Sequence, residues 1–238
     1  MVGECLQRSG YWMGDDLMPP TAGNPRGYFE SYTVEGINER LLEQVVPARS
    51  RGWRGRWQRG RMDRGQRWLA RLGREASVAA TAAASAAIAD LTARRPFAFK
   101  DPRFCYTWPV WRPHVGDAAV VVVFREPAAT ATSILRECAR EAYLRRVRMT
   151  WDRALAVWRL QYERVLGYAE AEPGRWHLVH YDDMMTGAGI ARLEAALGTA
   201  LDTSGIDPGL RRSGTSGAVP ADIQRVYARL CARAGREA

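Results

Sequence analysis

Arg125 and Ser133 have the residue types and the spacing to bind one anion together. The segment from Ala118 to Ser133 reads AAVVVVFREPAATATS, an unbroken apolar run followed by Arg125 and then by small residues. A guanidinium presents parallel donors that suit phosphate oxygens, and a hydroxyl about two helical turns later can reach the same anion. The alternative is a buried strand that ends in a solvent-exposed arginine. The pattern therefore predicts either a phosphate clamp or a strand end without a function.

The elements around this arginine favour the clamp. An apolar run without alternation, from Ala118 to Phe124, is typical of a strand covered on both faces in a parallel sheet. Pro127 suits the first turn of a following helix, where its missing N–H would have no partner. Arg125 then lies at the carboxyl end of a strand, where ligands bind in open α/β sheets. We expect an anion site at this edge.

Lys100 is the one lysine among 35 basic residues, the rest of which are arginines. It ends a short apolar run, Phe97 to Lys100, which predicts a buried strand, and it is followed by Asp101 and Pro102, which are typical of a helix start. A compact ammonium at a strand end can donate a hydrogen bond to an oxygen that gains charge as a bond breaks. The alternative is a surface lysine without a role.

These segments resemble sulfotransferases that use 3′-phosphoadenosine 5′-phosphosulfate (PAPS). VVVFREPAATATS resembles their 3′-phosphate-binding element, and FAFKDPR resembles the segment whose lysine contacts the sulfuryl group and the bridging oxygen of the leaving phosphate. GDDLMPPTAGNPRGYFES resembles the loop that bacterial enzymes of this type carry after their first helix. The resemblance implies transfer of a sulfuryl group from PAPS, as co-substrate, to a hydroxyl or amine.

The resemblance also implies roles for two further residues. Glu30, in the GYFE segment, is the candidate general base, because a carboxylate can take the proton of the acceptor hydroxyl. The alternative is a carboxylate in a solvated loop. Asp15 and Asp16 are weaker candidates, since aspartates in such loops more often cap helices or turns. Tyr181 ends a predicted strand at 176–181 and begins the segment YDDM. The resemblance implies that it lies near the adenine ring, where its face can stack.

The sequence patterns that point to acceptor contacts and to a loop over the 3′-phosphate are less specific. Arg103 is either structural or a substrate contact. The aromatic segment 104–114 predicts core and acceptor-pocket wall, with Trp108 as the candidate contact. RSGTS at 212–216 has the letters of a phosphate loop, but no strand-like run precedes it, so we do not expect the main loop there. A late loop covering the 3′-phosphate is the alternative, with candidates Arg211, Arg212 and Ser213.

The N-terminal segment departs from the pattern of the family. Such enzymes open with a strand and an RSGTS-type loop whose backbone N–H groups and helix N-terminus hold the 5′-phosphosulfate. Here residues 1–9 predict a short helix that Gly10 ends, with no strand before it. Two explanations follow: the true start lies upstream, which we favour because Met1 fits inside a first helix, or the protein is a remnant that no longer catalyses.

Length and pattern predict one three-layer α/β domain over residues 1–238 with a parallel central sheet. The resemblance implies that this is the P-loop-like sulfotransferase fold with its first strand missing. Residues 49–74 hold ten arginines and three tryptophans. They predict a basic helical insert with its guanidiniums in water. A lid that recruits the anionic substrate or cofactor, or a surface for single-stranded nucleic acid, are the alternatives.

Composition bounds the compartment and the partners. Four cysteines without a CxxC pair, no signal peptide and no apolar run of membrane-spanning length predict a cytoplasmic protein with free thiols. We expect no metal, since His177 and His180 lack a third ligand. The acceptor is a small metabolite, a lipid or a carbohydrate; nucleic acid is not expected, and the oligomeric state is not predicted.

Two other functions fit parts of the chain. One is a non-catalytic, arginine-rich protein that binds nucleic acid or other anions, which the net charge of +9 allows. The other is a P-loop-type nucleotide kinase, which would require a GxxxxGK[ST] loop; Lys100 is not in one.

Overall fold

The computed structural model describes residues 1–21, 24–48, 61–206 and 217–237. The chain divides into two compact units, each assembled from separate segments. Unit one consists of Met1–Ser9, Asp117–Glu137 and Met149–Ala238, and unit two of Gly10–Gly116 and Cys138–Arg148. The predicted site residues are divided between the units, so each unit is described by itself.

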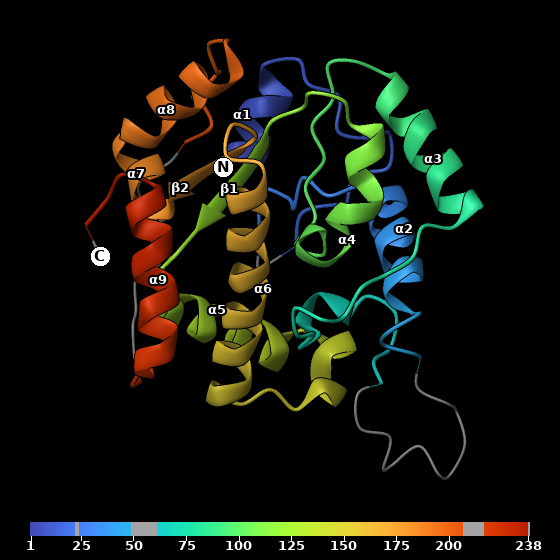
Figure 1. Ribbon diagram of the computed structural model, residues 1–238, viewed down its shortest axis with the longest axis vertical. Coiled ribbons are helices and arrows are strands. Elements are labelled where there is room, and N and C mark those ends of the chain that lie inside the picture. Colours follow the sequence, from blue (N-terminus) through green and yellow to red (C-terminus); the bar gives the residue numbers. More distant parts are fainter. Residues whose placement is uncertain (22–23, 49–60, 207–216, 238) are drawn as a thin grey trace. The chain divides into compact units, whose positions relative to one another are not determined.

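Unit one is built on a parallel pair of strands, β1 (Val120–Phe124) and β2 (Trp176–His180). Val120 pairs with Trp176 and Phe124 pairs with His180, so the two carboxyl ends lie at one edge. The chain passes from β1 to β2 through α5 (Pro127–Arg140), the short 3₁₀ helix η4 (Ala142–Val147) and α6 (Trp151–Ala171) (Figure 1). Both strands and the helix that begins at Pro127 confirm the sequence predictions. The described chain is an α/β structure with a small parallel sheet.

Helices pack on both faces of this sheet. On one face, Val121 and Val179 join an apolar cluster with α1 (Val2–Arg8), α7 (Tyr181–Thr186) and α8 (Ala188–Leu197). On the other, the ring of Phe124 contacts aromatic residues of α6 and of α9 (Ala221–Arg233), which lie side by side in Figure 1. Gly187, whose φ is 87°, separates α7 from α8, because glycine adopts this left-handed conformation without strain.

Unit two is mainly helical. It contains α2 (Tyr32–Leu42), η2 (Arg67–Leu69), α3 (Ala82–Ala93), α4 (Phe104–Trp111), η3 (Arg112–His114) and η4. Ser31 caps α2, since its Oγ accepts from the backbone N–H groups of Thr33 and Val34. Thr81 provides the N-cap of the alanine-rich helix α3. The Ser31 cap fixes the start of α2 next to Glu30.

The strand predicted at 97–100 does not form. Phe97 makes a single parallel bridge with Trp12, supported by a 2.9 Å hydrogen bond from Ala98 N to Trp12 O. The partner segment is too short for more, because Gly10 and Gly14 turn the chain on either side of Trp12 with φ of 86° and 112°. Lys100 thus follows one bridge rather than a strand.

The arginine-rich segment also differs from its prediction where it is described. Residues 61–74 contain only the three-residue η2 instead of a helical insert, and residues 49–60 lie outside the described residues. Arg67, expected in water, is 2% exposed. All four cysteines are free and buried, as predicted. No helix in the described ranges combines the length and apolar character needed to cross a bilayer.

Candidate active site

Glu30 and Lys100 form the centre of the candidate site in unit two. Lys100 Nζ donates to Glu30 Oε1 at 2.5 Å and to the backbone oxygen of Tyr28 at 2.9 Å. These bonds use two of the three ammonium protons, and Lys100 remains half-exposed. In the described part of the chain, Glu30 Oε2 accepts no hydrogen bond. The pair therefore presents a proton acceptor beside a cationic donor.

The environment of Glu30 favours a basic carboxylate. Its side chain is 13% exposed. Burial raises the pKa of Glu30, and the nearby Lys100 ammonium opposes this rise only in part. A carboxylate with a raised pKa is a better proton acceptor than a solvated one. Glu30 is therefore not the solvated loop carboxylate that was the alternative.

Asp16 fixes the backbone next to Glu30. Its carboxylate accepts from Ser31 Oγ at 2.5 Å, from Thr33 N at 2.8 Å and from Thr33 Oγ1 at 2.7 Å. Burial acts to raise the pKa of Asp16, but these hydrogen bonds outweigh it and hold the pKa below its usual value. Asp16 is therefore a charged capping residue at the start of α2, the role that the sequence analysis preferred.

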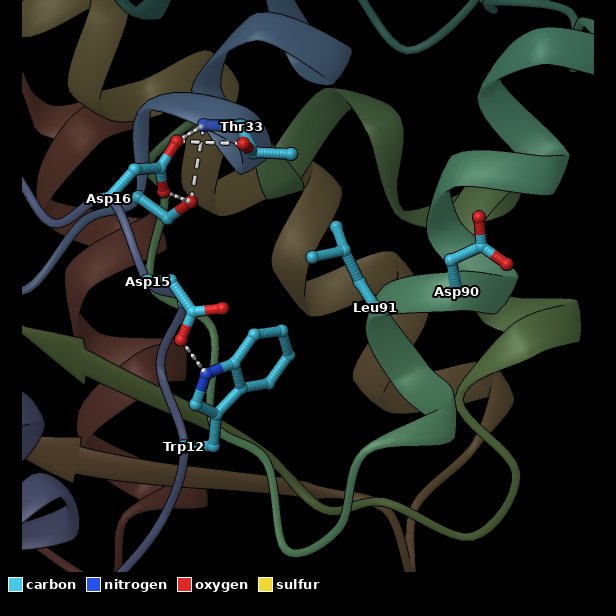
Figure 2. A pocket seen from close by; sticks show the side chains of 8 residues that line it. Trp12, Asp15, Asp16, Thr33, Asp90 and Leu91 are labelled. Carbon is cyan, nitrogen blue, oxygen red and sulfur yellow. Dashed lines mark hydrogen bonds between the residues drawn. The ribbon is translucent and has the colours of Figure 1, made fainter.

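A hollow of about 300 Å³, shown in Figure 2, is lined in part by Ser31, the residue after Glu30. The indole of Trp12 donates to Asp15 on one side, and Asp90 and Leu91 of α3 lie on the other. Its lining residues are Trp12, Gly14, Asp15, Asp16, Ser31, Thr33, Asp90 and Leu91. The hollow is large enough for part of a small molecule and has one aromatic wall.

Arg103 is buried in a network of ion pairs behind Lys100. Its guanidinium donates to Glu39 at 2.7 Å, to Glu35 at 3.1 Å and to Asp101 at 3.1 Å, and its side chain is 3% exposed. Asp101 also accepts from Arg103 N at 2.7 Å, in the turn before α4. The N-cap of α4 is Arg103 rather than Asp101, because the helix begins only at Phe104. The sequence left two roles open for Arg103, a structural one and a substrate contact. These contacts are structural.

The same network extends deeper into unit two. Arg67 Nη1 donates to Glu39 at 2.6 Å, and Asn38 Nδ2 donates to Asp101 at 3.0 Å. Sequence reasoning missed these residues. A signal was present, because Asn38 lies four positions after Val34 and so falls on the apolar face of α2. Trp108, proposed for the acceptor pocket, is 7% exposed within α4.

Removing the Arg103 guanidinium is expected to destabilise the protein strongly. Arg103→Met leaves Glu39 and Asp101 buried with one partner fewer, which costs about 3–5 kcal/mol in the free energy of unfolding. Urea unfolding followed by circular dichroism measures this loss. Arg94→Gln is the matched control, since Arg94 is 59% exposed and its pair with Asp15 is worth about 1 kcal/mol at most. Equal losses in the two variants would contradict this account of the network.

Arg125 and Tyr181 contact each other at the carboxyl edge of the sheet in unit one. The guanidinium carbon of Arg125 lies 4.7 Å from the centre of the Tyr181 ring. Trp158 Nε1 donates to the backbone oxygen of Arg125 at 3.2 Å and so fixes the strand end against α6. The Arg125 guanidinium and the Tyr181 ring, which the sequence analysis singled out in separate segments, therefore lie in contact at this edge.

The N-terminus of α5 is already occupied. Glu126 accepts from Ala128 N at 3.0 Å and from Ala129 N at 2.8 Å, so a carboxylate of the chain caps this helix. An external anion at this edge must then be held by side chains rather than by the helix end. Ser133 is exposed on the same helix. Arg211, Arg212 and Ser213 lie outside the described residues.

Comparison with known proteins identifies the family of this chain. A model of the sulfotransferase family matches residues 29–202. The chain belongs to the sulfotransferase family. The match includes Glu30, Lys100, Arg125, Ser133 and Tyr181. Neither a curated protein nor a solved structure matches the chain.

Membership of the sulfotransferase family bears on the alternatives. It confirms the resemblance found in the sequence and indicates transfer of a sulfuryl group rather than phosphoryl transfer by a P-loop kinase. Within the described residues of this family member, no group of three or more histidine, cysteine or acidic side chains is arranged to hold a metal ion.

Proposed function

We propose that this protein transfers a sulfuryl group from PAPS to a hydroxyl or amine of its acceptor. The observation that carries the proposal is the contact between Glu30 and Lys100. Each group keeps one unused hydrogen-bonding site among the described residues: Oε2 on the carboxylate and the third N–H on the ammonium. Such a pair suits sulfuryl transfer, because a proton leaves the acceptor while charge builds on the leaving oxygen.

The reaction is an in-line displacement in which the protein mainly positions and stabilises. Glu30 takes the acceptor proton as the acceptor oxygen or nitrogen forms its bond to sulfur. The bond between sulfur and the bridging oxygen of the donor breaks, and that oxygen keeps the electron pair. Lys100 donates its third N–H to this oxygen and stabilises the charge. The adenosine 3′,5′-bisphosphate product leaves with that charge.

The groups on unit one fit the nucleotide of the donor. Arg125 is half-buried at a sheet edge with its guanidinium against Tyr181, which supplies a cation for the 3′-phosphate and a ring for the adenine. Ser133 adds a hydroxyl donor. Arg211, Arg212 and Ser213 complete the proposed phosphate contacts. The three-layer arrangement of the family fold also belongs to this proposal.

The acceptor is proposed to lie in the hollow beside Ser31. Its indole wall and polar rim suit a small molecule, or one end of a lipid or carbohydrate, that presents a hydroxyl or amine. Arg103 and Trp108 are buried, so their contribution to acceptor binding is through the packing behind Lys100. The cytoplasmic location expected from the sequence belongs to the proposal as well.

Calorimetry with adenosine 3′,5′-bisphosphate tests the nucleotide site. Arg125→Ala is expected to weaken binding by about 10- to 100-fold, the value of a charge-assisted hydrogen bond to phosphate. Arg229→Ala is the matched control, because it removes an exposed charge from the same unit, where Arg229 pairs with Glu170. Binding that is equally tight in wild type and Arg125→Ala would contradict the clamp. Release of adenosine 3′,5′-bisphosphate from PAPS with a panel of acceptors tests the transfer.

A further inference from the structure

Phe29 has a backbone conformation that is rare for an aromatic residue. Its φ is 56°, in the left-handed region that favours glycine. Among the described residues the only other non-glycine residue with positive φ is Arg148, at 49°. A bulky side chain in this region costs free energy, so the surrounding structure must hold it there.

The two neighbours of Phe29 both bind Lys100. Tyr28 accepts from Lys100 Nζ through its backbone oxygen, and Glu30 accepts through its carboxylate. In an extended chain, carbonyl groups lie in the plane of the strand and side chains project out of it, so these two acceptors would diverge. The left-handed turn at Phe29 brings them to one ammonium.

Hydrogen bonds on both sides of Phe29 hold the turn in place. Tyr28 Oη and Thr21 Oγ1 are 2.9 Å apart, and Met18 N donates to the backbone oxygen of Glu30 at 2.8 Å. Ser31, next along the chain, is fixed by Asp16. The strain at Phe29 is therefore maintained by these three contacts on either side of it.

We propose that Phe29 is a positioning residue, whose left-handed backbone aims the Tyr28 carbonyl and the Glu30 carboxylate at Lys100. Held by two acceptors, the ammonium keeps its third N–H directed away from both. The inference concerns a residue that has no role in the proposed function, although its kinetic consequence rests on that function.

Chemical labelling of Lys100 tests the inference without any assumption about activity. Lys100 is the one lysine of the chain, so acetic anhydride has one side-chain amine to modify, and mass spectrometry resolves it from the terminal amine. Phe29→Ala and Phe29→Asn both remove the ring, but asparagine tolerates the left-handed region far better. We expect Phe29→Ala, and still more Phe29→Val, to raise the labelling rate by about two- to fivefold, the value of losing one partly exposed ion pair. Phe29→Asn should stay near the wild-type rate.

Arg148→Val provides the matched control, because it places a β-branched residue at the other non-glycine position with positive φ among the described residues of unit two. It should leave the labelling of Lys100 unchanged. Equal labelling rates in folded Phe29→Ala and Phe29→Asn would overturn the proposal, as would an increase in Arg148→Val. If Phe29→Val does not fold, the comparison of alanine with asparagine still decides.

Kinetics then separate the two proposals. With sulfuryl transfer established, Phe29→Ala should lower kcat by about tenfold, as expected for misplaced reacting groups. It should leave the affinity for adenosine 3′,5′-bisphosphate unchanged, whereas a general loss of structure would lower both. If the wild type transfers no sulfuryl group, the proposed function fails while the labelling result still tests the role of Phe29.

Discussion

Glu30→Gln is expected to lower kcat for sulfuryl transfer by about 10²- to 10⁴-fold, the range that a general base contributes. The amide keeps the shape of the side chain and can still accept from Lys100, but it cannot take the acceptor proton. Because burial raises the pKa of Glu30, the wild-type rate should rise with pH through that raised value as the carboxylate loses its proton. Steady-state rates across pH should show this acid limb in the wild type and not in the variant.

Glu43→Gln is the matched control for this experiment. Glu43 is 52% exposed at the end of α2, so removing its charge should leave kcat and its pH dependence unchanged. Nucleotide binding by Glu30→Gln should be as tight as in the wild type, or tighter, because the Lys100 ammonium is no longer neutralised. A folded Glu30→Gln variant that turns over at the wild-type rate would remove Glu30 from the mechanism.

Lys100→Met should lower kcat by about 10²- to 10³-fold, because the leaving oxygen loses a preorganised cationic donor. It should also move the acid limb of the rate profile to higher pH. The sign follows from the ion pair: the Lys100 ammonium lowers the pKa of Glu30, so its removal lets that pKa rise and the active carboxylate form only at higher pH. Single-turnover rates with PAPS, measured as a function of pH, test both effects.

Two variants sharpen the Lys100 experiment. Lys100→Arg keeps the charge but replaces a compact ammonium with a planar group, so it should restore the position of the acid limb more fully than the rate. Arg71→Gln removes an exposed charge from the same unit and should change neither. An acid limb that does not move in Lys100→Met would show that Glu30 is not the titrating base.

Part of the candidate site could be predicted from the sequence because local patterns carry it. The apolar run before Arg125, and the acid and lysine in distinctive segments, pointed to residues that lie in the family match. The contact between Glu30 and Lys100 could not be predicted, since it joins segments 70 residues apart. That contact depends on the turn at Phe29, and no periodicity in the sequence reports a positive φ at a phenylalanine.

The errors have a common physical cause. Phe97 to Lys100 has the composition of a strand, but a strand also needs a partner, and the glycines beside Trp12 allow only one bridge. Arg67 was expected in water because most arginines are exposed, yet Glu39 provides a buried partner. Both outcomes depend on groups distant in sequence, which composition and spacing do not report.

The segmented construction of unit one constrains how the chain acquires its structure during synthesis. The cluster that contains Leu6 of α1 and Leu193 of α8 unites segments that are far apart in the sequence. At ribosomal rates, roughly 10 to 40 seconds separate the emergence of these residues. Until Leu193 has emerged, Val121 of β1 lacks part of its covering layer, so we expect this face of the strand to stay open to non-native contacts during that interval.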